Sequence, residues 1–136
     1  MAKILITGGA GFIGYHLAKK LMEDGNEVVL CDRSPEATKD SELEELLKNK
    51  NVKKVICDLT DPSSIEKLGS GYDHVYHLAG INGFHLFKEI PHEVLRVGIL
   101  STINILEWFR IRNNKPDAKI VFPSSNEVSL GALISL

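Results

Sequence analysis

The sequence predicts an α/β protein with one doubly wound parallel sheet. Short apolar runs of strand length alternate with helical segments through five strands, which is typical of a parallel sheet with helices on both faces. A glycine-rich octet, TGGAGFIG, lies between the first apolar run and the first helical segment. Right-handed crossovers and this position of the octet favour the strand order 3-2-1-4-5.

The first half of the chain supplies three strands and two helices. AKILIT at 2–7 is expected to be the first strand, and a helix is expected to follow over 11–25. EVVLCD at 27–32 is expected to be the second strand. A loop then leads to a charged amphipathic helix at about 41–49, and the third strand is expected over 52–58.

The second half supplies the other two strands. Asp61 is expected to cap a short helix over 61–69, with a proline at its first helical position. The fourth strand is expected at 73–79 and the fifth at 118–124, with the longest helix, from residue 91 to about 113, between them.

The composition suits one compact domain and excludes several classes of function. Hydrophobic residues make up 43% of the chain and charged residues 25%. The net charge of −2 gives no basic surface for nucleic acid or for an anionic membrane. No apolar run approaches the roughly 20 residues of a membrane span. The N-terminus lacks the features of a signal peptide, so a cytoplasmic protein is expected.

The octet TGGAGFIG predicts a dinucleotide site. Glycines let the chain turn sharply out of a strand and approach a pyrophosphate, and the helix N-terminus that follows attracts the phosphate charge. The octet fits G-x-G-x-x-G on Gly9, Gly11 and Gly14, which is typical of ordinary dehydrogenases. It also fits the wider spacing of short-chain dehydrogenases, which begins at Gly8. The octet alone does not decide between these templates.

An acid at the end of the second strand supports the same site. Asp32 follows Gly14 by 18 residues, where a carboxylate can accept hydrogen bonds from both ribose hydroxyls. Its charge would repel a 2′-phosphate, so NAD is expected rather than NADP. Arg33 keeps NADP as the alternative, because a guanidinium could pair with that phosphate. Asp58, at the end of the third strand, is expected either to cap the next turn or to reach the adenine amino group.

Six blocks in order extend this pattern along the chain. They are TGGAGFIG, CD at 31–32, CDL at 57–59, VYHLAG at 75–80, STINILEW at 101–108 and VFPSS at 121–125. Together they resemble the N-terminal part of the extended short-chain dehydrogenase/reductase family, and within it the NAD-dependent nucleotide-sugar epimerases and dehydratases. VYHLAG and VFPSS favour the template that begins at Gly8 and leave Gly9 as a source of turn flexibility.

The resemblance implies roles for particular residues. The amides of Phe12 and Ile13 would meet the pyrophosphate, and Ser124 would lie beside the nicotinamide. Ser125 would take the place of the family's catalytic Ser/Thr. With the residues named above, the expected cofactor-binding set is Gly8, Gly11, Phe12, Ile13, Gly14, Asp32, Arg33, Asp58, Leu59, Leu78, Ala79, Gly80 and Ser124.

Tyr15 and Lys19 have the Tyr-x-x-x-Lys spacing of the family's catalytic pair, but they are expected in the first helix beside the glycine loop and far from any nicotinamide, so they do not stand in for it. A Tyr-x-x-x-Lys pair, whose tyrosinate removes a hydroxyl proton while hydride moves to the nicotinamide, is expected well beyond Ser125. Gly98 also stands where the family usually has an asparagine. We therefore expect an NAD-binding domain over 1–128 that is truncated after the fifth strand and catalytically incomplete. A short apolar tail at 129–136 would follow, without a substrate domain.

Two classes of function remain open. The first is the NAD-binding part of a nucleotide-sugar epimerase or dehydratase, with a nucleotide sugar as the substrate of a complete relative. The second is a non-enzymatic nucleotide sensor or assembly module built on a shortened Rossmann domain. Reductases that act on flavonoids or sterols are a weaker third interpretation, because they usually carry a basic residue where this chain has Asp32.

The cysteines and histidines are expected to be structural. Cys31 and Cys57 each precede an aspartate and are expected at equivalent ends of neighbouring strands, as buried reduced thiols without a redox role. His74 and His77 are three residues apart on a strand, so they point to opposite faces and cannot share a metal ion. His85 is expected in a loop, and no metal site is expected.

The longest helix is expected to be covered on two sides. Over 92–113 it is apolar nearly all round. One side would pack on the sheet, and the other could form a homodimer, as the resemblance implies. Trp108 and Phe109 are candidate anchors for that dimer, although a place in the core is favoured for either residue taken singly.

Overall fold

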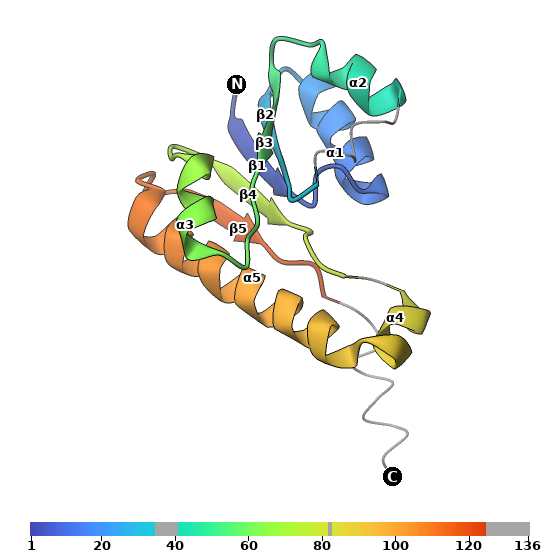
Figure 1. The fold of residues 1–136 in the computed structure, drawn as a ribbon. Helices are drawn as coiled ribbons and strands as arrows, with labels where there is room; N and C mark the ends of the chain where they lie inside the picture. The colour runs from blue at the N-terminus through green and yellow to red at the C-terminus, as the bar shows by residue number, and fades with distance from the viewer. Residues whose placement is uncertain (35–40, 82, 125–136) are drawn as a thin grey trace.

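A computed structural model describes residues 1–34, 41–81 and 83–124. It contains one five-stranded parallel sheet in the order β3-β2-β1-β4-β5, which confirms the predicted fold class and strand order (Figure 1). The strands are β1 (Lys3–Thr7), β2 (Glu27–Asp32), β3 (Val52–Ile56), β4 (His74–His77) and β5 (Lys119–Val121).

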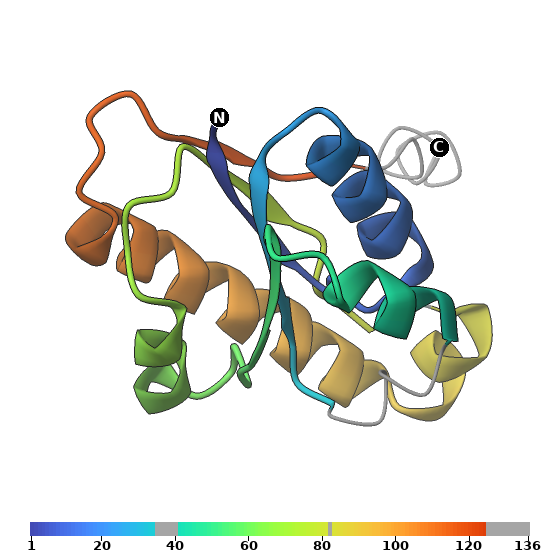
Figure 2. The ribbon, with the colours of Figure 1, turned by 90° about the horizontal axis from the view of Figure 1, so that it is seen from above.

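The helices form a layer on each face of the sheet. They are α1 (Phe12–Glu23), α2 (Ser41–Leu47), α3 (Pro62–Ile65), α4 (Phe84–Glu89) and α5 (Pro91–Arg112), with a 3-10 turn, η2 (Glu66–Leu68), after α3. One layer holds α1 and α2, and the other holds α3 and α5 (Figures 1 and 2). Among the described residues, no helix is both long and apolar enough to cross a membrane.

The short helix α4 was not predicted. His85 was expected in a loop, but it lies in this six-residue helix between Gly83 and Ile90. A helix of under two turns shows too little of the 3.6-residue periodicity to be recognised from sequence. In the structure α4 contacts the neighbouring helix α5, from which only Ile90 separates it.

Two cores meet at the central strand β1. Ile4 and Ile6 pack with residues of α1 and α2, whereas Leu5 packs with residues of α3 and α5. This alternation follows from the pleat of the strand, in which successive side chains point to opposite faces. All three side chains are at most 2% exposed, so β1 is fixed on both faces.

The register of the sheet aligns the carboxyl ends of its central strands. Thr7, the last residue of β1, pairs with Cys31 on β2 and with His77 on β4. The carboxyl ends of these three strands therefore lie side by side. The chain continues from β1 to one side and later returns to β4 on the other. Open α/β sheets bind their ligands beyond the strand ends at this kind of switch point.

The long helix α5 packs one face on the sheet and leaves the other uncovered. Trp108 is 3% exposed, and its indole nitrogen donates to the Gly69 carbonyl at 3.1 Å. Phe109 packs partly buried against the same core. Trp108 therefore lies in the core, the place favoured from the sequence, and is not exposed as a dimer anchor. The exposed apolar residues of α5 are instead Leu95, Ile99, Ile103, Leu106 and Ile111.

Candidate functional site

The glycine loop between β1 and α1 is too tight for side chains. Gly8 has a φ of +67°, which favours glycine. A Cβ on Gly8 would lie 3.0 Å from the backbone of Ala79, and a Cβ on Gly14 would lie 2.5 Å from the Gly8 carbonyl oxygen. Gly11 donates its backbone N–H to that same oxygen at 3.1 Å. The loop therefore folds against itself and against the chain that leaves β4.

Gly9 is required for a different reason from the one predicted. It is not among the glycines with a positive φ, so turn flexibility does not explain it. A Cβ on Gly9 would lie 2.8 Å from Cδ2 of Leu30 and 3.0 Å from the carbonyl oxygen of Ile6. Its role is close packing of the loop against β2. Since both glycine templates match sterically required positions, the octet alone could not separate them.

The start of α1 has the features that favour anion binding. Gly11 is the N-cap residue, and it makes no side-chain cap. The first N–H groups of a helix have no partner within it and carry partial positive charge. A cavity lies against this helix end, lined by Gly8, Gly11, Phe12, Ile13, Gly14, Asp32, Leu78 and Gly80. The residues predicted to face a pyrophosphate are therefore brought together here.

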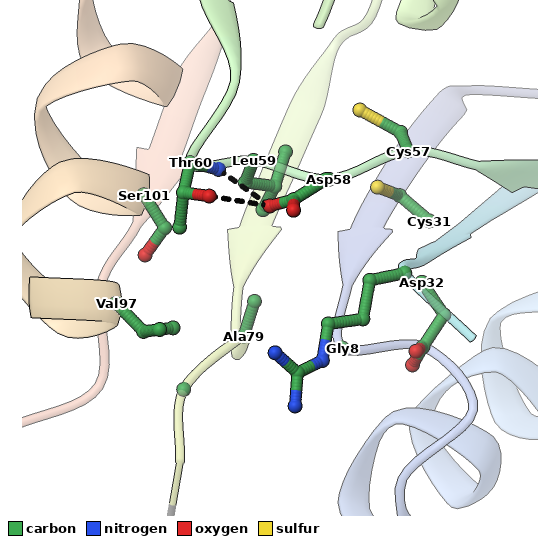
Figure 3. A pocket seen from close by; sticks show the side chains of 12 residues that line it. Gly8, Cys31, Asp32, Cys57, Asp58, Leu59, Thr60, Ala79, Val97 and Ser101 are labelled. Carbon is green, nitrogen blue, oxygen red and sulfur yellow. Dashed lines mark hydrogen bonds between the residues drawn. The ribbon is translucent and has the colours of Figure 1, made fainter. Parts of the chain in front are cut away.

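A second cavity of about 110 Å³ adjoins the first (Figure 3). It is lined by Gly8, Cys31, Asp32, Arg33, Cys57, Asp58, Leu59, Thr60, Ala79, Gly80, Val97 and Ser101. Because Gly8, Asp32 and Gly80 line both cavities, the two are parts of one groove. Of the thirteen residues predicted to bind a cofactor, only Ser124 does not line the groove. Ser125, the predicted catalytic hydroxyl, lies outside the described residues.

Asp32 lies where the two cavities join. One carboxylate oxygen accepts the backbone N–H of Ala10 at 3.3 Å, and the other accepts that of Ser34 at 3.2 Å. These bonds fix the carboxylate between the glycine loop and the end of β2. Each carboxylate oxygen has capacity for a further hydrogen bond, so Asp32 can still accept from hydroxyl groups of a ligand.

Asp58 caps the turn after β3. Its Oδ1 accepts from the backbone N–H of Thr60 at 2.9 Å and from the Thr60 hydroxyl at 2.7 Å (Figure 3). The backbone N–H of Asp58 donates to the Ser64 hydroxyl at 3.1 Å. The predicted turn role is confirmed. Asp58 also lines the second cavity, where it could reach a ligand. Its contact with an adenine amino group stays a prediction.

A buried chain of hydrogen bonds runs from the groove to α5 through His77. The Thr102 hydroxyl donates to the Gly98 carbonyl at 2.7 Å, so its oxygen accepts from His77 Nε2 at 3.2 Å. With its one proton on Nε2, neutral His77 accepts from the Thr7 hydroxyl at Nδ1 at 2.8 Å, and the Thr7 oxygen also accepts the Ala79 N–H at 3.1 Å. Burial lowers the pKa of His77 to about 4, so the ring is neutral near pH 7.

Several lining residues were missed from the sequence. Thr60 follows Asp58 in the turn, while Val97 and Ser101 lie four residues apart on α5 and so share one helix face. A stripe of small side chains on an otherwise bulky helix was the available signal. Gly98 stands where the family usually has an asparagine. A Cβ added to Gly98 would meet no atom within 4 Å, so this position faces open space.

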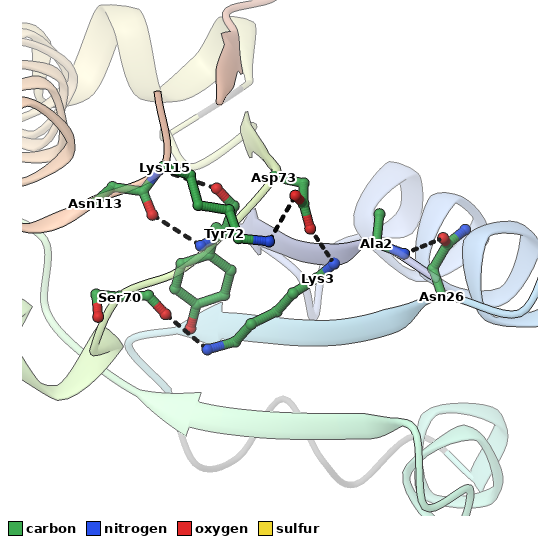
Figure 4. A network of polar contacts seen from close by, with 8 residues as sticks. All are labelled: Ala2, Lys3, Asn26, Ser70, Tyr72, Asp73, Asn113 and Lys115. Atoms are coloured by element: carbon green, nitrogen blue, oxygen red, sulfur yellow. Dashed lines mark hydrogen bonds and ion pairs between the residues drawn. The ribbon is translucent and has the colours of Figure 1, made fainter. Parts of the chain in front are cut away.

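The opposite ends of the strands hold a polar cluster that is structural (Figure 4). Asp73 accepts the Lys3 backbone N–H at 2.8 Å and the Lys115 ammonium at 2.7 Å. The Asn113 side chain accepts from the backbone N–H of Tyr72 and donates to its carbonyl, at 2.8 and 3.0 Å. These contacts tie the end of α5 to β4. Across the described parts of the chain, no group of three or more His, Cys, Asp or Glu residues could hold a metal ion.

The parallel sheet, the glycine loop and the acid at the end of β2 define a Rossmann-like nucleotide-binding fold. The model of the NAD dependent epimerase/dehydratase family matches residues 4–129. The chain belongs to this family, and the resemblance seen in its sequence blocks is confirmed.

Relatives and solved structures agree with this assignment. The chain is 34% identical to UDP-glucuronic acid decarboxylase 5 of Arabidopsis thaliana over 127 residues, covering 93% of this chain and 34% of the relative. It is 35% identical to the UDP-N-acetyl-alpha-D-glucosaminuronate decarboxylase of Bacillus cytotoxicus over 126 residues, covering 93% and 37%. The chain thus spans about a third of the length of these relatives.

The fold matches a nucleotide-sugar enzyme of known structure. The UDP-glucose 4-epimerase from Bifidobacterium longum, solved in complex with NAD+ and UDP, superposes with a TM-score of 0.78 at 31% identity. The match covers 93% of this chain and 38% of that one.

Proposed function

We propose that residues 1–128 form the NAD-binding part of an enzyme that acts on nucleotide sugars. One observation carries this proposal: a single groove joins an uncapped helix N-terminus, a fixed carboxylate and a cavity at the strand ends. The pyrophosphate would lie against the amides of Phe12 and Ile13, the ribose against Asp32, and the adenine in the second cavity. The family's dependence on NAD and the sugar nucleotides in its members' names support this proposal.

NAD would supply the hydride acceptor, and this chain's described residues would bind and orient it. None of the three tyrosines is placed to act as a base in the groove. The Tyr72 hydroxyl donates to the Leu68 carbonyl at 2.6 Å, and burial raises the pKa of Tyr72 to about 12. Tyr15 and Tyr76 pack against the core under α1 and α2. We therefore expect these 136 residues alone to bind NAD without turning over a UDP-sugar.

Calorimetric titration with NAD and NADP tests the binding proposal. NAD is expected to bind more tightly than NADP, because the Asp32 carboxylate would accept ribose hydroxyls and repel a 2′-phosphate. Asp32→Asn keeps the shape and removes the charge. This variant should weaken NAD roughly tenfold or more, since a hydrogen bond to a charged group contributes about 1.5–3 kcal/mol. The substitution should also reduce the difference in affinity between NAD and NADP. The absence of heat with NAD, or tighter binding of NADP, would contradict the proposal.

We also propose that a second copy of the chain covers the exposed face of α5. Leu95, Ile99 and Ile103 are 59%, 55% and 55% exposed, and their spacing of four places them in one stripe. Exposed apolar stripes of this kind mark interaction surfaces.

Sedimentation equilibrium tests this dimer. The wild-type chain is expected to be dimeric and Ile103→Glu monomeric, because dimerisation would bury the new charge. Ile56→Glu, at an exposed position at the end of β3, is the matched control and should keep the dimer. A monomeric wild type would contradict the proposal.

A further inference from the structure

We propose that Asn104 is a positioning residue for the adenine half of the nucleotide. Its side chain holds the Asp58 carboxylate in the orientation that accepts the 6-amino group of adenine, so the second cavity prefers adenine to a 6-oxopurine. This preference rests on the proposed NAD site, which puts the adenine in that cavity. The tie between Asn104 and Asp58 does not depend on the proposed function.

One peptide group links the two side chains. The side-chain amide of Asn104 donates to the Leu59 carbonyl at 2.9 Å. The other end of the same peptide group is the N–H of Thr60, which donates to Asp58 Oδ1 at 2.9 Å. A trans peptide is planar, so its C=O and N–H point in opposite directions. A donor that fixes the carbonyl therefore also aims the N–H at the carboxylate.

Asn104 reaches this turn from a distant helix. It lies on α5, 45 residues along the chain from Leu59, and it is half-buried. Val97, Ser101 and Asn104 are spaced four and three residues apart, so they share one face of α5. Within the described part of the chain, Val97 and Ser101 line the second cavity and Asn104 does not. Its effect on a nucleotide therefore passes through the peptide group rather than through direct contact.

The backbone before this peptide group has a separate support. The Ser64 hydroxyl accepts the Asp58 N–H at 3.1 Å, and Cys57 Sγ donates to the Ser64 carbonyl at 3.3 Å. Cys57 is 2% exposed, as predicted for a buried structural thiol. Ser64 thus holds the chain up to Asp58, whereas Asn104 holds the peptide group that follows. Loss of the Asn104 amide should therefore release the carboxylate without unfolding the strand end.

The hydrogen bonds leave one oxygen of Asp58 for the base. Oδ1 accepts from both the backbone N–H and the hydroxyl of Thr60, so Oδ2 is available to a ligand. An ionised carboxylate only accepts hydrogen bonds. The 6-amino group of adenine donates, whereas the 6-oxo group of hypoxanthine accepts and would lie against the negative charge. A fixed carboxylate therefore favours adenine, and a carboxylate that can rotate loses this preference.

The first experiment measures hydrogen exchange in the 136-residue chain without nucleotide. Asn104→Leu keeps the approximate volume of the side chain and removes its donor. The Thr60 amide should exchange about five- to tenfold faster in this variant, because its peptide group is no longer held toward Asp58. An unchanged rate at Thr60 would overturn the inference.

Asn113→Leu is the matched control for this exchange measurement. Asn113 also uses its side chain to bond backbone groups, but at Tyr72 and at the opposite ends of the strands. This variant should lose stability and keep the wild-type exchange rate at Thr60. Faster exchange at Thr60 in both variants would show a general loosening of the fold and would contradict a specific tie.

The second experiment compares NAD with nicotinamide hypoxanthine dinucleotide by calorimetry. The wild type should bind NAD about tenfold more tightly, a difference of about 1.4 kcal/mol. Asn104→Leu should weaken NAD about fivefold and leave the Kd of the hypoxanthine analogue unchanged, because only the amino group uses the fixed carboxylate. Asn113→Leu should keep the wild-type preference. Equal weakening of both dinucleotides in Asn104→Leu would mean a structural role and would refute the proposal.

A double-mutant cycle tests whether Asn104 acts through Asp58. Asp58→Ala should abolish the preference for adenine. Adding Asn104→Leu to Asp58→Ala should then change the Kd of NAD by less than about twofold, since the carboxylate that Asn104 orients is gone. Additive losses would show that Asn104 acts by another route. If the wild type binds no NAD, the proposed function fails, while faster exchange at Thr60 would still support the tie between Asn104 and Asp58.

Discussion

Replacing Gly14 by alanine is expected to weaken NAD binding about 10- to 100-fold and to lower the stability of the fold. Its Cβ would lie 2.5 Å from the Gly8 carbonyl oxygen and 2.8 Å from Gly9 Cα, and both atoms belong to the backbone. Neither atom can rotate away, so α1 or the loop must shift. The helix N-terminus would then lose its position against the pyrophosphate, where charge-assisted hydrogen bonds contribute about 1.5–3 kcal/mol each.

The sign of the stability change depends on two opposing effects. Alanine is favoured over glycine in a helix by about 1 kcal/mol. Overpacking a tight site costs about 1–3 kcal/mol, so the clash at Gly14 should exceed the gain in helix propensity. Gly98→Ala is the matched control, because a Cβ there meets nothing within 4 Å. It should raise Tm by roughly 4 °C.

Thermal unfolding and calorimetry with NAD measure both variants. Gly14→Ala should lose stability and affinity together, whereas Gly98→Ala should gain stability and keep the affinity of the wild type. A Gly14→Ala protein that binds NAD as tightly as the wild type would show that the loop does not hold the pyrophosphate.

The fold could be predicted because its strands are continuous apolar runs separated by helical patterns. Apart from the short helix α4, the errors fall at the ends of elements, where apolar residues continue beyond the hydrogen-bonded ladder. The fifth strand was expected over 118–124, but β5 covers only Lys119–Val121. β5 lies at the edge of the sheet and pairs with β4 alone, so no second neighbour extends it.

The groove could be predicted where a local motif, a strand end or the resemblance to the family indicated its residues. The glycine loop and Asp32 follow from spacing along the chain, because a strand, a turn and a helix bring them together. Val97 and Ser101 reach the same cavity from the distant helix α5. Their contribution depends on how α5 crosses the strand ends, which is a property of tertiary packing and leaves no fixed spacing in the sequence.

Stability is expected to fall as the pH drops from about 6.5 to 4, because His77 is buried in its neutral form. Burial lowers the pKa of His77 from 6.5 to about 4. Above pH 6.5 His77 is neutral in both the folded and the unfolded states, so its titration does not reduce the free energy of unfolding there. Below it the unfolded state binds a proton that the folded state excludes, and folding is penalised until the pH reaches the folded pKa. A shift of this size corresponds to about 3 kcal/mol at most.

Burial excludes that proton from the folded state, and the hydrogen bonds of His77 match its neutral form. His77 Nδ1 accepts from the Thr7 hydroxyl, whose own oxygen accepts the Ala79 N–H. If Nδ1 carried a proton, the Thr7 hydroxyl could no longer donate to it. This buried hydroxyl would then be left without an acceptor. Acidification should therefore loosen the junction between the glycine loop and the chain after β4, so NAD affinity should fall over the same pH range.

Urea unfolding at a series of pH values between about 7 and 4 measures the effect. His77→Gln retains a donor and an acceptor but does not titrate, so subtracting its pH profile cancels the carboxylates that titrate in both proteins. The difference between the wild type and His77→Gln should shrink steadily below pH 6.5. His74→Gln, on the same strand, serves as the control and should keep the dependence of the wild type. Parallel profiles for wild type and His77→Gln would mean that His77 accepts a proton in the folded protein, and the chain from Thr7 to Thr102 would then have to form with an imidazolium at its centre.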